Sequence, residues 1–117
     1  MAEWSISIVP TGAASGPQAA FVSRLQPDGV NATTGDVVTW NNETPDTHQP
    51  WPADDQFNPL KGVTPSDQNY LSNPIPAKHS SRPSWIVRNL TTNKPPVRFC
   101  YVCALHPDEQ GVITITS

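Results

Sequence analysis

Fourteen prolines are spread through this chain of 117 residues, and they constrain its fold more than any other feature of the sequence. Proline donates no backbone hydrogen bond and clashes with the preceding turn inside a helix. The apolar repeat of an amphipathic helix, at positions i, i+3 and i+4, is also missing. The sequence therefore predicts a fold built from strands.

Short runs of alternating or β-branched residues supply the candidate strands. They are WSISIV (4–9), GDVVTW (35–40), SWIVRNL (84–90), VRFCYVC (97–103) and GVITIT (111–116). Residues that favour turns, namely Pro, Gly, Asn and Asp, separate these runs. We predict an all-β sandwich or barrel in which residues 1–117 form a single domain.

The segment 45–83 differs from the rest of the chain because it is rich in proline and poor in aliphatic residues. Such a long irregular segment is unusual in a compact domain and is often functional. We expect an irregular insertion between strands, with one short helix near residues 66–72.

The charge and hydropathy of the chain exclude two classes of partner. Seven Lys and Arg against ten Asp and Glu give a formal net charge of −3, without a basic run that could neutralise a phosphate backbone. No apolar stretch approaches the roughly 20 residues that span a bilayer. We expect neither a nucleic-acid partner nor a membrane span.

The run 97–103 contains both cysteines of the chain. With a period of two, Cys103 shares a face with Phe99 and Tyr101, whereas Cys100 points to the opposite face. A Cys100–Cys103 disulfide would require the strand to break, and a zinc knuckle would need a second cysteine pair that the chain lacks. We expect Cys100 to be a strand residue and Cys103 to be either a small buried hydrophobe or a ligand.

His106 favours the ligand interpretation of Cys103, because a tight loop after the strand can bring the imidazole back beside the thiolate. A third ligand has to come from a distant segment, and His48 and His79 are the other histidines. His48 follows a predicted strand and its loop, whereas no strand leads to His79. We therefore favour His48, and the alternative that these histidines are ordinary surface residues stays open.

The blocks GDVVTWNNETPDTH (35–48) and FCYVCALHPDEQGVITIT (99–116) resemble the cupredoxins, the small blue-copper electron carriers. The resemblance implies a Greek-key β-sandwich of about seven or eight strands. It also implies one copper ion per chain, bound by His48, Cys103 and His106. Two imidazoles and one thiolate suit both Cu(I) and Cu(II). An electron carrier that is not an enzyme, a transient redox partner protein and a periplasmic or secreted location are further implications of the resemblance.

The fourth ligand position departs from the family pattern. Where the family has a weak axial methionine, two residues before a glycine, this chain has Glu109, followed by Gln110. Glutamine is known as an axial ligand, but we favour Glu109. A carboxylate is a harder and stronger donor than a thioether, so it would favour Cu(II) and lower the potential. In the alternative, Asp108 and Glu109 are solvated loop acids, and copper is three-coordinate or binds water.

Several rival functions remain open at this point. The first is an open, reactive copper site or a copper store, and the second is a metal-free β-sandwich that acts as a binding module. A dinuclear copper site needs wider spacing than C-x2-C-x2-H. A Cys103/His106 hydrolase is least favoured, because no orienting Asn or Asp and no oxyanion hole can be assigned.

Overall fold

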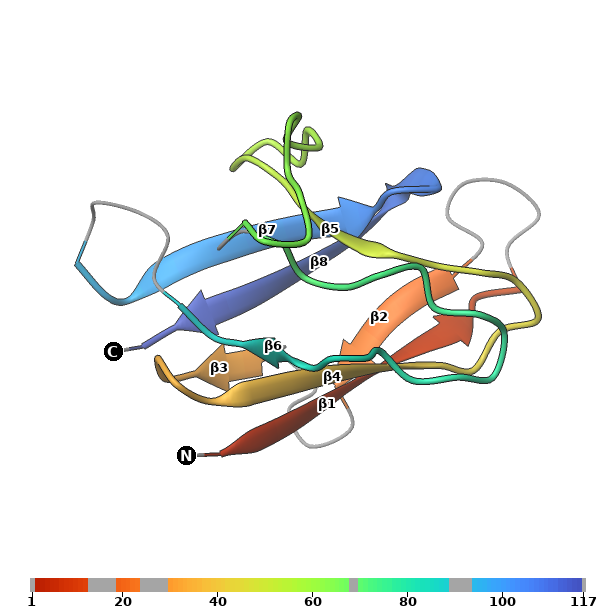
Figure 1. Ribbon diagram of the computed structural model, residues 1–117, viewed down its shortest axis with the longest axis horizontal. Coiled ribbons are helices and arrows are strands. Elements are labelled where there is room, and N and C mark those ends of the chain that lie inside the picture. Colours follow the sequence, from red (N-terminus) through yellow and green to blue (C-terminus); the bar gives the residue numbers. More distant parts are fainter. Residues whose placement is uncertain (1, 13–18, 24–29, 68–69, 89–93, 117) are drawn as a thin grey trace.

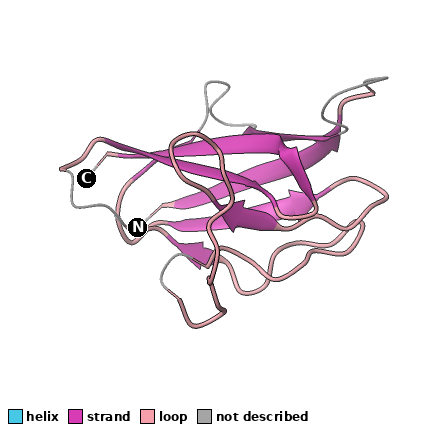
Figure 2. Cartoon of the chain, turned by 90° about the horizontal axis from the view of Figure 1, so that it is seen from above, coloured by secondary structure: helices cyan, strands magenta, loops and turns pink. Residues whose placement is uncertain are grey.

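The computed structural model describes residues 2–12, 19–23, 30–67, 70–88 and 94–116, and all regular structure in these ranges is β (Figures 1 and 2). The strands are β1 (Glu3–Pro10), β2 (Ala19–Ser23), β3 (Val30–Ala32), β4 (Val37–Asn42), β5 (Pro50–Pro52), β6 (Trp85–Ile86), β7 (Val97–Cys103) and β8 (His106–Ile115). None of the described residues lies in a helix capable of crossing a membrane. The prediction of an all-β fold is confirmed.

The eight strands form two four-stranded sheets, in the orders β2-β1-β4-β6 and β3-β8-β7-β5. β1 is parallel to β4 and β3 is parallel to β8, whereas the remaining neighbours are antiparallel. Both sheets face the core with alternate residues, as a period of two requires. The result is a β-sandwich.

Aromatic side chains fill much of the space between the sheets. The Tyr101 ring on β7 meets Trp40 of β4 edge-on at 5.5 Å between centroids and Phe21 of β2 at 4.8 Å. Trp85 stacks on Phe99 at 5.1 Å. Both Phe99 and Tyr101 belong to the main core cluster, so the predicted inward face of the run 97–103 is confirmed.

The opposite face of β7 is buried as well. Cys100 and Val102 form a second cluster with Ala53, against which Trp51 and Phe57 pack. Because both faces of β7 are covered, its end is firmly placed, which matters for the residues that follow it.

The segment between β5 and β6 is irregular, as predicted, but β5 itself lies inside the span 45–83 predicted to be irregular. The segment first projects beyond the sheet that contains β5 and then runs back alongside β4 (Figure 1). Isolated bridges fasten it, pairing Asn41 with Ser80, His48 with Ile75 and Ala53 with Pro59.

The helix predicted near 66–72 is wrong for the described part of that range. Residues 65–67 form turns, 68–69 lie outside the described residues, and 70–72 have no regular structure. Tyr70 N donates to Asp67 O, a bond of turn spacing that does not propagate into a helix.

The strand predicted at 84–90 is shorter than expected. Only Trp85–Ile86 pair regularly, and residues 89–90 lie outside the described residues. After Ile86 the chain bonds to the turn before β4 instead, where Val87 N donates to Asp36 O and Gly35 N donates to Val87 O.

Candidate metal centre

The connection from β7 to β8 brings His106 beside Cys103. The last strand is longer than the predicted run 111–116, because β8 begins at His106 and leaves a turn of only Ala104 and Leu105. Cys103 pairs with His106 and Val102 pairs with Gln110, so the register shifts and residues 107–109 bulge out of the ladder. Such bulges redirect side chains. Here Pro107 and Asp108 in the bulge separate His106 from Glu109 along the strand.

His48 reaches the same end of the sandwich from the link between β4 and β5. Its backbone pairs with Ile75, since His48 N donates to Ile75 O at 3.1 Å and Ile75 N donates to His48 O at 2.7 Å. The next residue, Gln49, accepts from Ala104 N at 2.8 Å and so joins this link to the β7–β8 turn.

Asn42, at the end of β4, ties the link together. Its buried amide Nδ2 donates to Asp46 O at 2.7 Å and to Ile75 O at 2.9 Å. Its Oδ1 accepts from the backbone and the hydroxyl of Thr44 at 3.0 and 2.7 Å. The side-chain amide of Asn42, which both donates and accepts these hydrogen bonds, therefore holds the loop before His48 in place.

Four candidate ligands converge at this end: His48, Cys103, His106 and Glu109, with ligand atoms all within 4.8 Å of one another. The sulfur of Cys103 lies 3.6 Å from Nδ1 of His48 and 3.6 Å from Nδ1 of His106. The carboxylate oxygens of Glu109 lie 2.9 Å from Nδ1 of His48 and 3.7 Å from Nδ1 of His106.

The alternation of β8 explains why Glu109 joins the cluster and Gln110 does not. Side chains two residues apart on a strand share a face, so Glu109 lies on the same face of β8 as Gly111 and the buried residues Ile113 and Ile115. Glu109 is itself buried. Gln110 faces the other way and is exposed. His79 is likewise exposed and lies outside the cluster of four.

Burial dominates the electrostatics of the site. It raises the pKa of the Cys103 thiol, and the backbone N–H groups of Gln49, Leu105 and His106 oppose this rise. Burial also raises the pKa of Glu109, against the attraction of His48 and then His106. Burial thus disfavours both the Cys103 thiolate and the Glu109 carboxylate, whereas a bound cation would stabilise them.

The geometry fits a shared metal ion better than direct pairing. Among the described residues, neither carboxylate oxygen of Glu109 has a hydrogen-bond partner of good geometry, although both are buried. A sulfur at about 2.3 Å and a nitrogen at about 2.0 Å from one ion lie about 3.5 to 3.7 Å apart at bond angles of about 110° to 120°. The two sulfur–nitrogen distances of 3.6 Å agree with that arrangement.

The site is open on one side. The side chains of His48 and Glu109 are 3% and 1% exposed, whereas that of His106 is 40% exposed. A cavity of about 300 Å³ is lined by His48, His106 and Glu109 together with residues such as Thr44 and Asp46. Solvent therefore reaches the cluster along the exposed edge of His106.

Sequence reasoning missed the supporting residues around this cluster. Gln49 N donates to Cys103 Sγ at 3.4 Å, and Asn42 fixes the loop before His48. The position of Gln49 directly after a candidate histidine was the available signal for its role. Both cysteines are free, in agreement with the expectation that they do not pair, and Cys100 is buried away from the cluster.

Comparison with known proteins identifies the architecture. No protein-family model and no curated protein sequence matches the chain. A novel purple cupredoxin from Nitrosopumilus maritimus has a similar structure, with a TM-score of 0.63 and 17% sequence identity over 99% of this chain and 100% of that chain. The chain therefore has the cupredoxin fold.

Proposed function

We propose that the chain binds one copper ion through His48, Cys103, His106 and Glu109 and passes single electrons to and from a partner protein. The observation that supports this most is the buried carboxylate of Glu109, whose oxygens lack good hydrogen bonds yet face two imidazole nitrogens beside a thiol. A buried carboxylate without partners is costly unless a cation compensates it.

Each of the four residues has a distinct task in this proposal. When bound, copper supplies a one-electron redox couple. The soft Cys103 thiolate suits Cu(I), and the imidazoles of His48 and His106 suit both states. The Glu109 carboxylate adds a hard donor and negative charge, which favour Cu(II). The Asn42 network and the buried faces of β7 hold these groups in place, so little has to move when an electron passes.

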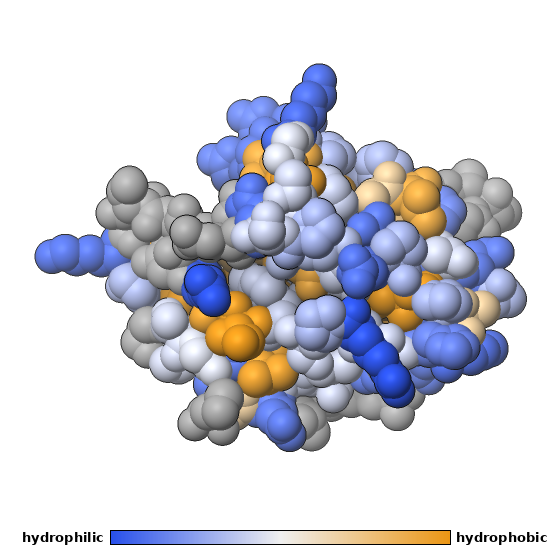
Figure 3. Space-filling view, viewed as in Figure 1, coloured by the Kyte–Doolittle hydropathy of each residue, from blue (hydrophilic) through white to orange (hydrophobic). Residues whose placement is uncertain are grey.

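The exposed edge of His106 is the proposed route for electrons. Leu105 beside it is 53% exposed, one of three large hydrophobic residues that stand out on the described surface. Figure 3 shows a small apolar area near the β7–β8 turn, with polar residues next to it and further apolar areas elsewhere on the same face. Such a small apolar contact fits a transient redox encounter, for which interfaces are small.

Copper titration with matched cysteine variants tests the metal site. We expect reduced apoprotein to bind one equivalent of Cu(II) with an intense thiolate-to-copper charge-transfer band. Cys103→Ser should abolish the band, whereas Cys100→Ser, at the other buried cysteine, should keep it. A colourless wild-type mixture, or equal loss in both variants, would refute the proposal.

The cavity beside the cluster favours a second candidate, an open copper site that reacts with small molecules. Its lining includes His48, His106 and Glu109, and its volume is large enough for a small anion or a diatomic gas. Adding azide to the copper-loaded protein separates the two functions. An unchanged absorption spectrum supports a closed carrier, and a new band supports the reactive site.

A further inference from the structure

Gln49 occupies a junction between the candidate centre and the irregular segment 53–83. We propose that Gln49 is a positioning residue, whose side chain fixes the peptide N–H that donates to the Cys103 sulfur and thereby sets the electronic properties of the site. The influence on copper rests on the proposed function, whereas the positioning itself does not.

Two hydrogen bonds leave Gln49 in different directions. Its backbone N–H donates to Cys103 Sγ at 3.4 Å, and its side-chain Nε2 donates to Ser72 O at 3.0 Å. Ser72 is 1% exposed and Gln49 is 9% exposed. Because both partners are buried, water cannot readily replace the amide if it is removed, and Ser72 O would lose its partner.

The peptide group between His48 and Gln49 is held at both ends. Its carbonyl oxygen, on His48, accepts from Ile75 N at 2.7 Å, and its N–H, on Gln49, faces the sulfur. The Gln49 side chain also donates a hydrogen bond to Ser72 O, three residues before Ile75. The segment 72–75 therefore contacts this link at two points and can fix the plane of the peptide relative to Cys103.

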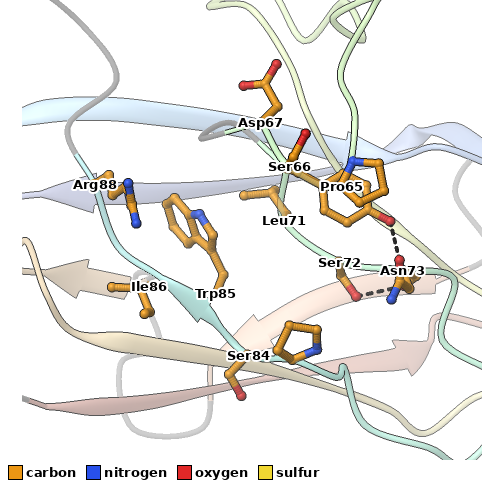
Figure 4. Close-up of a pocket in the computed structure, with 12 residues that line it drawn as sticks. Pro65, Ser66, Asp67, Leu71, Ser72, Asn73, Ser84, Trp85, Ile86 and Arg88 are labelled. Carbon is orange, nitrogen blue, oxygen red and sulfur yellow. Dashed lines mark hydrogen bonds between the residues drawn. The ribbon is translucent and has the colours of Figure 1, made fainter.

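The segment that receives the Gln49 side chain is itself well anchored. Leu71 is buried in the main core. Ser72 Oγ donates to Asn73 O at 2.7 Å, and Tyr70 Oη donates to Asn73 Oδ1 at 2.5 Å (Figure 4). Asn73 Nδ2 in turn donates to Arg82 O at 3.4 Å. This network forms one wall of a surface pocket of about 320 Å³ and makes Ser72 O a fixed acceptor.

The sulfur is the atom through which this positioning has chemical consequences. A hydrogen bond to a thiolate withdraws electron density from it, and hydrogen bonding around the cysteine sulfur tunes the potential of His2Cys copper sites. If the backbone N–H of Gln49 moves away from Cys103, the N–H···S bond weakens and the sulfur donates more electron density to the metal. Cu(II) then gains relative to Cu(I), so the reduction potential falls.

Gln49→Met tests the inference, because methionine matches glutamine in length but cannot donate to Ser72 O. Gln56→Met is the matched control, since Gln56 is an exposed glutamine in the nearby segment 53–83. In metal-free protein, hydrogen exchange at the backbone amide of residue 49 should be about fivefold to tenfold faster in Gln49→Met than in wild type, after correction for core amides such as that of Val38. Gln56→Met should leave it unchanged.

The copper-loaded proteins give the second readout. Gln49→Met should still bind one copper, with a displaced charge-transfer band and a lower potential. The inference is overturned if hydrogen exchange at the residue-49 backbone amide becomes faster only by the same factor as at the core amides. It is also overturned if exchange at residue 49 becomes faster on its own while the charge-transfer band and the reduction potential keep their wild-type values. If wild type forms no coloured copper complex, the proposed function fails while the exchange result still decides the positioning role. Should Gln49→Met not fold, Gln49→Asn shortens the reach by one methylene and is judged by the same outcomes.

Discussion

Glu109 Oε1 lies 2.9 Å from Nδ1 of His48, with both side chains almost wholly withdrawn from solvent. Despite this distance, the carboxylate has no hydrogen bond of good geometry within the described structure. The two groups are therefore close to each other, and to Cys103 and His106, without forming a hydrogen bond. Without a cation, this arrangement destabilises the fold, and with one it becomes a ligand set.

The first prediction concerns the metal-free protein. Burial raises the pKa of Glu109, so the folded state keeps a proton that the unfolded chain loses above a pH of about 4.3. The stability that this proton provides is complete below that pH and is lost as the pH rises through the folded pKa. Glu109→Met should therefore raise the free energy of unfolding at pH 7 by about 1 to 3 kcal/mol relative to wild type, as measured by urea unfolding. The gain should be smaller at pH 4.

Glu3→Met is the control for this comparison, because Glu3 is an exposed carboxylate on β1. It should change the stability of the apoprotein by no more than about 0.5 kcal/mol at either pH. A metal-free Glu109→Met protein that is less stable than wild type at pH 7 would show that the carboxylate is satisfied within the fold.

The same variant should behave in the opposite way once copper is bound. Replacing a carboxylate by a thioether removes a hard anionic donor, so Cu(II) is stabilised less than Cu(I). We expect the reduction potential of Glu109→Met to exceed that of wild type by about 59 mV or more, a tenfold change in the ratio of the two affinities. Equal potentials, measured by redox titration of the charge-transfer band, would mean that Glu109 is not a ligand.

The sequence was sufficient to predict the class of fold and to select four residues that the structure brings together. Period-two alternation in 97–103 indicated that Cys103 faces inward, and the order of strands favoured His48 over His79. Counting back by two from Ile113 would also have favoured Glu109 over Gln110. The inward placement of Cys103 could be predicted because strand periodicity is a local property of the chain.

Long-range contacts account for what could not be predicted. The bulge at 107–109 exists because β8 pairs with β7 on both sides of it, and no residue within the bulge specifies that pairing. The roles of Asn42 and Gln49 depend on carbonyl groups of Ile75 and Ser72, which belong to a segment without periodicity. In the described part of 66–72 the expected helix does not form, and Ser72 O there bonds to the distant side chain of Gln49.

A third prediction concerns copper and global stability. Metal that binds the folded state alone stabilises it by mass action, by about 2.7 kcal/mol at a free concentration one hundred times the dissociation constant. Copper should raise the midpoint of thermal unfolding by several degrees, and a chelator should reverse the change. The increase should shrink in acid, because protons compete for the four ligands. Cys103→Ser should lose most of the increase, and an increase of the same size there would place copper elsewhere.

A fourth prediction concerns the loop before His48. Asn42→Ala removes a donor to Asp46 O and Ile75 O and an acceptor for Thr44. Ile75 O keeps the bond from His48 N and Asp46 O keeps the bond from the Thr44 hydroxyl, whereas the buried Thr44 N–H loses its acceptor Asn42 Oδ1. We expect destabilisation of about 2 to 4 kcal/mol in urea unfolding and copper affinity reduced about tenfold to a hundredfold. Asn41→Ala, at the neighbouring exposed-side position of β4, should have less than half the effect on stability and none on copper affinity.

The last prediction links the end of β8 to the core. Gly111 pairs with Tyr101 across β7 and β8, and a methyl group at Gly111 would overlap the Tyr101 ring at its Cζ and Oη atoms. The ring packs against Trp40 and Phe21, so it has little room to withdraw. Gly111→Ala should cost about 1 to 3 kcal/mol through overpacking.

A double-mutant cycle separates this overlap from a simple effect on the strand. Tyr101→Leu alone should be destabilising because it leaves a cavity, but in its presence Gly111→Ala should cost much less than in wild type. Additive effects in urea unfolding would mean that the glycine is required for its backbone and not for the ring. Since Gly111 is only two residues from Glu109, we also expect Gly111→Ala to shift the charge-transfer band of the copper-loaded protein, and the double variant to shift it less.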